Sequence, residues 1–193
     1  MKGFPILKKQ LHNRPNEKNI KKANLGMVLE EMINNANLYY LDKDRAVIHK
    51  KPTPIQIVKV NYPARNMAVI TEAYYKTPST TDYNGIYRGK YIDFEAKETN
   101  NITSFSLANV HPHQVNHLKK INAHGGIGFL LIFFKRLNEV YLLDILDFLP
   151  YWDNQKTGRK SIPYNYIKEK GKLVKLSYMP SICYLDAVDE IYF

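Results

Sequence analysis

The stretch from residue 82 to residue 97 constrains the fold most, because it predicts a β-hairpin whose second strand carries charged side chains. Side chains alternate between the two faces of a strand. The apolar residues within 92–97 therefore point to one face, whereas Asp93, Glu95 and Lys97 point to the other. A strand with acidic and basic groups along one face is a poor structural element, so the pattern indicates a functional surface.

The turn of this hairpin, at residues 88–90, folds the first strand back alongside the second. Asp82, on the first strand, is therefore expected to approach Glu95 and Lys97. Two carboxylates that converge beside a lysine suit a divalent cation with oxygen ligands, next to a scissile phosphate. For the Glu-x-Lys tripeptide alone, the alternative is a solvated strand face with a salt bridge.

The composition indicates a single basic domain with an anionic partner. A chain of 193 residues can form one substantial core. Its net charge of +10 implies nucleic acid, through phosphate neutralisation and counterion release, although a merely soluble basic protein is the alternative. The lone cysteine, Cys183, suits a reducing cytosol. No apolar run is long enough to span a bilayer, so we expect a cytoplasmic protein without membrane contact.

The first 22 residues differ in character from the rest of the chain. Residues 1–22 contain seven lysines and arginines but only one acidic residue, Glu17. Such a segment is expected to be a flexible arm that orders on DNA, with a solvated tail as the alternative.

An extended hairpin is predicted between the first helix and the charged hairpin. Residues 55–60 and 67–70 are expected to be two strands that flank a linker at 61–66 with turn residues. A compact core would need only a short connection at this place. An ordinary insertion into the sheet is the alternative.

The remaining periodicity predicts a mixed α/β core. One apolar stretch is uniform enough to be a central, buried strand. The expected elements are a helix from Asn24, a helix at 110–124 closed by Gly125-Gly126, strands at 127–134 and 139–143, a helix at 145–152, and short strands and turns at 173–182.

Four separate blocks of the sequence share a pattern with known nucleases. They are 82–85 with 92–99 (DYNG and IDFEAKET), 48–54 (IHKKPTP), His113-Gln114 with His117-Leu118, and 158–162 (GRKSI). An aspartate, a hairpin turn and then Glu-x-Lys resembles the PD-(D/E)xK nuclease superfamily. The longer strings resemble the RecU family of Holliday junction resolvases, over about residues 24–193.

The resemblance implies an α/β fold, in which a mixed β-sheet flanked by helices forms a restriction-endonuclease-like core. Residues 23–193 would form a single nuclease domain with an insertion at about 50–80. This insertion would be a protruding β-hairpin stalk that enters the open centre of a four-way junction.

The resemblance also implies a metal-dependent, structure-selective endonuclease that resolves four-way DNA junctions by paired symmetric nicks during recombination and repair. Mg²⁺ would be the metal, with Mn²⁺ able to substitute. A RecA-type recombinase and a junction-migrating helicase are expected partners. The alternative is a non-catalytic binder of branched DNA, or a regulator of a recombinase.

A homodimer is expected because a resolvase must place two nicks symmetrically, and a two-fold axis supplies two identical sites. The apolar residues 127–134 and the carboxy-terminal residues 191–193 are candidates for its interface. Core packing is the alternative for residues 127–134.

The predicted catalytic residues are Asp82, Glu95, Lys97 and Gln114. A magnesium ion held by Asp82 and Glu95 would polarise the phosphate, and Lys97 would orient the attacking water or neutralise the phosphorane. Thr80 and Gln114 complete the predicted metal ligands. For Gln114 this role is implied by the resemblance, and a glutamine on the helix surface is the alternative.

Four other polar residues have open roles. By resemblance Glu30 joins the site, with an exposed helix carboxylate as the alternative. Asp93 is either a third metal ligand or packs against a neighbouring strand. His113 and His117 stand at the i, i+4 spacing of a zinc site, but they lack its sequence context, so packing or phosphate contacts are favoured.

The predicted DNA-binding residues are basic and lie on the two hairpins. Lys59 and Arg65 belong to the stalk, with Arg65 at its tip, where it would meet phosphate or bases. Arg88 and Lys90 belong to the turn of the charged hairpin.

Overall fold

The computed structural model describes residues 28–64, 66–76 and 80–193. The predicted basic arm at 1–22 and the predicted tip residue Arg65 therefore lie outside the described residues. Within the described ranges, no helix is long and apolar enough to cross a bilayer.

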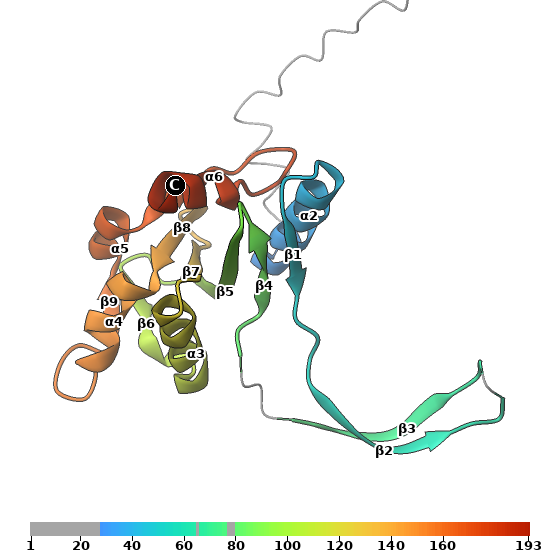
Figure 1. Ribbon diagram of the computed structural model, residues 1–193. Helices are drawn as coiled ribbons and strands as arrows, with labels where there is room; N and C mark the ends of the chain where they lie inside the picture. The colour runs from blue at the N-terminus through green and yellow to red at the C-terminus, as the bar shows by residue number, and fades with distance from the viewer. Residues whose placement is uncertain (1–27, 65, 77–79) are drawn as a thin grey trace, which may run out of the picture.

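A six-stranded mixed sheet forms the centre of the body, in the order β1-β4-β5-β7-β8-β10 (Figure 1). Neighbouring strands are antiparallel except β5 and β7, which are parallel and joined by a crossover that contains a helix. The strands are β1 (Val47–Lys50), β4 (Tyr83–Tyr87), β5 (Lys90–Thr99), β7 (Ile127–Phe134), β8 (Glu139–Asp144) and β10 (Lys172–Val174).

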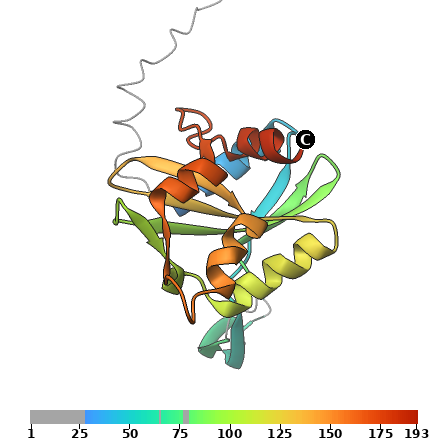
Figure 2. The ribbon, with the colours of Figure 1, turned by 90° about the vertical axis from the view of Figure 1, so that its left-hand side faces the viewer.

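Helices cover both faces of this sheet, and Figure 2 shows the sheet between the two layers. One layer holds α2 (Leu29–Asp42) and α6 (Tyr184–Tyr192), and the other holds α3 (Pro112–Ala123), α4 (Ile145–Asp153) and α5 (Tyr164–Lys170). A short ribbon of β6 (Ser104–Ser106) and β9 (Ser161–Pro163), with the 3-10 helix η1 (Leu107–Asn109), lies on the second side. The predicted mixed sheet flanked by helices is thus confirmed.

Strand β7 explains why one stretch of the sequence is uniformly apolar. Phe129 and Leu131 pack into the core under α2 and α6, whereas Leu130 and Ile132 pack into the core on the other side. Every residue of β7 is buried. A strand covered on both faces needs no polar alternation. Its burial within the body also settles residues 127–134 in favour of core packing over a dimer interface.

A stack of aromatic rings fixes the register of the central strands. Tyr83 on β4 stacks on Phe94 of β5 at 5.0 Å, and Phe94 stacks on Phe129 of β7 at 4.8 Å. These three residues are also cross-strand partners in the sheet. Such pairs favour one register, and this one determines what stands opposite Glu95.

The hairpin of β4 and β5 closes at the predicted turn, through a loop of two residues. Tyr87 pairs with Lys90, and the residues between them have positive φ angles, 49° at Arg88 and 74° at Gly89. Positive φ at both central positions is the geometry of a type I′ turn, which matches the twist of the flanking strands.

The second hairpin, β2 (Ile55–Asn61) and β3 (Val69–Tyr75), is a two-stranded sheet of its own that projects from the body (Figure 1). Every residue of β3 is exposed, and in β2 only Val60 is partly covered. The predicted stalk is therefore present, and insertion into the main sheet is wrong. The prediction placed the second strand at 67–70, but in a ribbon exposed on both faces apolar periodicity does not mark where a strand begins or ends.

Two helices were not predicted. The expected short strands and turns at 173–182 are present as β10 and a bridge between Leu176 and Ile182, but α5 and α6 flank them. Both helices have fewer than ten residues. Segments this short give little periodic signal, and their apolar faces are explained only by the sheet they cover.

Candidate functional site

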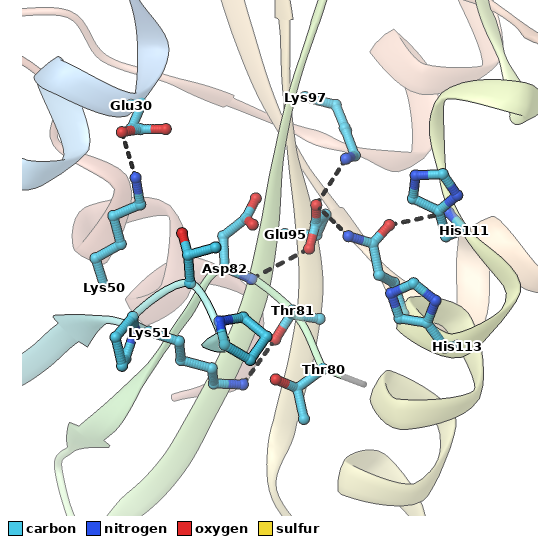
Figure 3. Close-up of a pocket in the computed structure, with 14 residues that line it drawn as sticks. Glu30, Lys50, Lys51, Thr80, Thr81, Asp82, Glu95, Lys97, His111 and His113 are labelled. Carbon is cyan, nitrogen blue, oxygen red and sulfur yellow. Dashed lines mark hydrogen bonds and ion pairs between the residues drawn. The ribbon is translucent and has the colours of Figure 1, made fainter. Parts of the chain in front are cut away.

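A polar pocket of about 600 Å³ opens beside the end of β4 at which the stalk joins the body (Figure 3). Five chain segments line it: the first turn of α2, residues 50–54, residues 80–82, the middle of β5, and the start of α3. Thr80, Asp82, Glu95, Lys97 and Gln114, the five predicted catalytic and metal-binding residues, all lie in its wall. The predicted site residues are thus brought together from distant parts of the sequence.

The hairpin register places Asp82 beside Glu95. Tyr83 pairs with Phe94, so the next position outward sets Asp82 against Glu95. The Asp82 backbone N–H donates a hydrogen bond to Glu95 Oε2 at 3.2 Å. The predicted approach of the two acidic residues across the hairpin is therefore confirmed.

Glu95 is an acidic residue in an environment that disfavours its charge. Its side chain is 0% exposed. Burial, followed by the charge of Asp82, raises the pKa of Glu95 to about 8, and the nearby Lys97 opposes this shift. Lys97 Nζ lies 2.7 Å from Glu95 Oε1. Within the described part of the chain no cation forms an ion pair with Asp82, so Lys97 only partly balances the two carboxylates.

Gln114 joins the site from the first turn of α3. Its Nε2 donates to Glu95 Oε1 at 2.7 Å, and its Oε1 accepts from the His111 backbone N–H at 2.9 Å. The second bond is half of a capping box at the helix start. Gln114 is 5% exposed, so the alternative of a helix-surface glutamine is wrong. Its amide oxygen, the atom a metal would need, is already hydrogen-bonded.

Glu30 and Asp93, whose roles were open, behave differently. Glu30 lines the pocket from α2, but its exposed carboxylate forms an ion pair with Lys50 and not with the acidic pair. Asp93 does not line the pocket. Both of its oxygens are occupied by hydrogen bonds, among them one from Lys51, so it does not stand as a third ligand in this arrangement.

His113 and His117 both lie on α3, but their side chains have different surroundings. His117 Nε2 lies 2.9 Å from Asp93, whereas His113 lines the pocket. No group of three or more His, Cys, Asp or Glu disposed to hold a metal occurs in the described ranges, and the zinc hypothesis gains no support. The His113 ring stacks on His111 at 5.5 Å, and its Nε2 is buried without a hydrogen-bond partner among the described residues. Burial, then His111 and Lys97, lowers the pKa of His113.

The structure does not bring Arg88 and Lys90 to the pocket. They stand at the turn of the β4–β5 hairpin, at the opposite end of β4 from Asp82. Arg88 Nη1 forms a 3.0 Å ion pair with Asp189, and its guanidinium lies 4.5 Å from the ring centroid of Phe193. The predicted contact residue Lys59 is exposed on β2 of the stalk.

Two basic residues of the pocket, Lys50 and Lys51, were missed as site residues. They belong to the 48–54 block, one of the four that carry the resemblance. This block could have indicated that the two lysines lie at the site. His111 was missed as well, because nothing in the sequence indicates that its ring turns toward the pocket.

Comparison with known proteins places this chain in a family. The family model described as "RecU: Recombination protein U" matches residues 24–190. The chain is 52% identical to the protein named Holliday junction resolvase RecU of Geobacillus kaustophilus, over 98% of this chain and 97% of that protein. It is 54% identical to the protein of that name from Bacillus mycoides, over 94% of this chain and 92% of the relative.

The protein of that name from Oceanobacillus iheyensis is 56% identical, over 89% of this chain and 88% of the relative. A weaker likeness, with a TM-score of 0.40 and 12% identity over 69% of this chain and 87% of the other, is to the structure of Hjc, a Holliday junction resolvase of Archaeoglobus fulgidus. On the match to the family model and the identities to three relatives, the chain belongs to the RecU family.

Proposed function

We propose that this chain is a metal-dependent endonuclease that resolves four-way DNA junctions by paired nicks. The carrying observation is the pair of carboxylates, Asp82 and Glu95, held together beside Lys97 in a polar pocket at the base of a projecting stalk. Relatives more than half identical over most of the chain are named Holliday junction resolvases, which supports the same reaction here.

The donor set of the pocket fits a hard divalent cation. Asp82 and Glu95 supply carboxylate oxygens, and the hydroxyl of Thr80 lies in the same wall. Burial and then the charge of Asp82 raise the pKa of Glu95, and a bound cation would favour the ionised carboxylate. Mg²⁺ needs few protein carboxylates because it retains several waters, and Mn²⁺ would fit the same oxygens. When bound, the metal supplies Lewis-acid activation of the phosphate and a more acidic water.

Two neighbouring side chains hold the Glu95 carboxylate in place. Gln114 Nε2 and Lys97 Nζ both reach Glu95 Oε1, each at 2.7 Å, so they fix the orientation of that carboxylate. Lys97 also brings positive charge to the place where a phosphate would bind, and would stabilise the charge that develops there.

Recognition of the junction is assigned to the stalk. Its exposed surface combines basic and aromatic side chains, among them Lys59, Tyr62 and Tyr75. Lysines bind phosphates, and unstacked bases at an open junction centre can stack on aromatic rings. Arg65, predicted at the tip, keeps its proposed role as a phosphate or base contact outside the described residues.

The active species is proposed to be a homodimer that works in the cytoplasm. A junction has two-fold symmetry, and two sites related by a matching axis deliver both nicks in one encounter. Ile191 and Phe193, at 39% and 49% exposure, remain available for an interface. A RecA-type recombinase and a junction-migrating helicase are retained as proposed partners on the basis of the family resemblance.

The test is cleavage of a synthetic four-way junction, with linear duplex of the same sequence as the control. We expect paired nicks on the junction with Mg²⁺ or Mn²⁺ and none with chelator, and a sedimentation mass near twice 22.5 kDa. Tight junction binding without cleavage under any of these metals would instead support the non-catalytic alternative.

A further inference from the structure

A second acidic centre lies beside the pocket, and its central residue is Asp93, which is 0% exposed. Asp93 Oδ2 accepts hydrogen bonds from Lys51 Nζ at 2.8 Å and from the Tyr91 hydroxyl at 3.0 Å. The same oxygen lies 2.9 Å from His117 Nε2, while Oδ1 accepts from the Thr81 hydroxyl. We name these five residues the Asp93 cluster.

The cluster joins the stalk to the body at its two legs, by which we mean the chain segments before β2 and after β3. Lys51 precedes the stalk strand β2, and Thr81 follows its return strand β3. Lys51 Nζ donates to Thr81 Oγ1 at 2.9 Å (Figure 3). The two legs therefore contact each other as well as Asp93. In the body, Asp93 belongs to β5 and His117 to α3.

The buried charge of Asp93 restricts the positions of the side chains around it. A buried carboxylate is costly unless it is paired and hydrogen-bonded. Lys51, with a side chain 18% exposed, is therefore held to one position by the buried charge of Asp93. The 3% exposed Thr81 is held by Asp93 and Lys51 together. The ion pair between Lys51 and Asp93 therefore lies at the base of a hairpin that is outside the main sheet.

The cluster also lies directly next to the acidic pair of the pocket. Thr81 precedes Asp82, and Asp93 stands two residues before Glu95 on the same strand. The backbone N–H of Lys51 donates to the carbonyl of Asp82 at 2.8 Å. Any shift of the legs would therefore move Asp82 relative to Glu95.

We propose that Asp93 is a positioning residue, which locks both legs of the stalk to β5 through Lys51 and Thr81 and so holds the stalk in a fixed position relative to Asp82 and Glu95. The inference rests on the proposed function, in which the stalk engages the junction centre while the pocket engages a phosphate. Nuclease geometry tolerates little error, since a displacement of about 1 Å can cost on the order of 100-fold in rate. Asp93 would thus act through geometry, without touching the metal or the substrate.

The lock is tested first by a distance measurement that needs no activity. Spin labels are attached at Gln56→Cys on the stalk and Lys119→Cys on α3, in the Cys183→Ser background, and labelled chains are diluted with unlabelled chain. Both labelled positions are exposed. Thr81→Val removes the hydroxyl at constant shape, and Thr81→Ser is the matched control that keeps it. We expect the distance distribution of Thr81→Val to be about two-fold broader, and that of Thr81→Ser to match the unsubstituted protein.

The second readout is cleavage of the synthetic junction at saturating Mg²⁺. Thr81→Val should cleave about ten-fold more slowly than Thr81→Ser, with equal affinity for linear duplex. If Thr81→Val does not fold, Lys51→Met replaces it, because Lys51 lies at the edge of the cluster. The exposed Lys43→Met, which breaks a surface ion pair with Asp42 and a contact with the Tyr39 ring, is then the control.

An unchanged distance distribution in the folded Thr81→Val or Lys51→Met variant would overturn the lock, even if cleavage fell. A broadened distribution with undiminished junction cleavage would overturn the link to catalysis. If the unsubstituted protein itself cleaves no junction, the proposed function fails, while the distance distributions still decide whether the cluster holds the stalk.

Discussion

The body and the stalk are built from the same kind of strand, but their side chains meet different surroundings. In β7 of the body every residue is buried, whereas every residue of β3 in the stalk is exposed. The body therefore owes its shape to apolar packing on both faces of a sheet. The stalk owes its shape to pairing between its own two strands and to the contacts at its base.

This difference shows which apolar residues serve the fold. Ile57, Val58 and Tyr75 on the stalk are 49%, 53% and 85% exposed. They contribute little to a core, and a run of exposed apolar side chains on one element marks a binding surface. The pocket lies where the two regions meet: Glu95 comes from the sheet, and Asp82 from the end of the stalk's return leg.

The largest expected effect is on junction cleavage, when one of the two pocket carboxylates is removed. Glu95→Gln or Asp82→Asn should reduce junction cleavage by at least about a thousand-fold, because each removes a carboxylate that would hold the metal. Junction binding, measured by gel shift, should remain or improve, since these carboxylates repel phosphate. Full activity in either variant would remove that residue from the site.

The next prediction compares packing in the two regions with the same substitution. Ile132 is 0% exposed in β7 and Ile57 is 49% exposed in the stalk. Ile132→Ala should lower the free energy of unfolding by about 2–5 kcal/mol, and Ile57→Ala by less than about 1 kcal/mol. Urea denaturation at low protein concentration measures both, and equal losses would mean that the stalk side chain is buried in solution.

The sequence predicted the parts of this fold that depend on local pattern. The alternation within 92–97 and the turn at 88–90 were enough to predict that Asp82 meets Glu95, because the register of a hairpin follows from its turn. The uniformly apolar stretch at 127–134 predicted a central strand for a similar reason. Both signals are contained within a few consecutive residues.

What the sequence did not predict depends on contacts between distant segments. Asp93 was left open between metal ligand and packing, because its partners Lys51 and His117 lie far from it in the sequence and meet it only in the fold. The side-chain orientation of Gln114 depends on the helix cap at His111. The short helix α6 is explained by the sheet face that it covers.

The free energy of unfolding should depend on pH through Glu95, which belongs to the body and not to the stalk. Burial and the charge of Asp82 raise the pKa of Glu95 from 4.5 to about 8 in the folded protein. Between these values the folded state retains a proton that the unfolded state has released, so the free energy of unfolding falls as pH rises. Over this window the metal-free protein should lose about 1–3 kcal/mol relative to Glu95→Gln.

Chemical denaturation of the two proteins at several pH values, with chelator present, measures this difference. Added Mg²⁺ should reduce it, because a bound cation replaces the proton that relieves the repulsion. If the free energy of unfolding of Glu95→Gln and of the unsubstituted protein changed in parallel with pH across the window, the pKa of Glu95 would not be raised in the folded protein.

The smallest effect is expected on the stalk surface, at Lys59. Its side chain is exposed on β2, and its cross-strand partner is Glu72. One exposed lysine contributes about one phosphate contact, so Lys59→Ala should weaken junction binding only a few-fold and reduce the salt slope of log K by about 0.9. Duplex binding should change less, because a duplex has no open centre for the stalk to enter.

Lys168→Ala on α5 is the matched control for this prediction, since it removes the same charge from an exposed position of the body. Binding titrations at several salt concentrations, on the junction and on linear duplex, separate the two cases. If Lys59→Ala and Lys168→Ala weakened both DNAs equally, Lys59 would contribute only to the general positive charge of the protein. A selective loss on the junction would instead mean that the region with no core of its own carries the discrimination, while the packed body carries the chemistry.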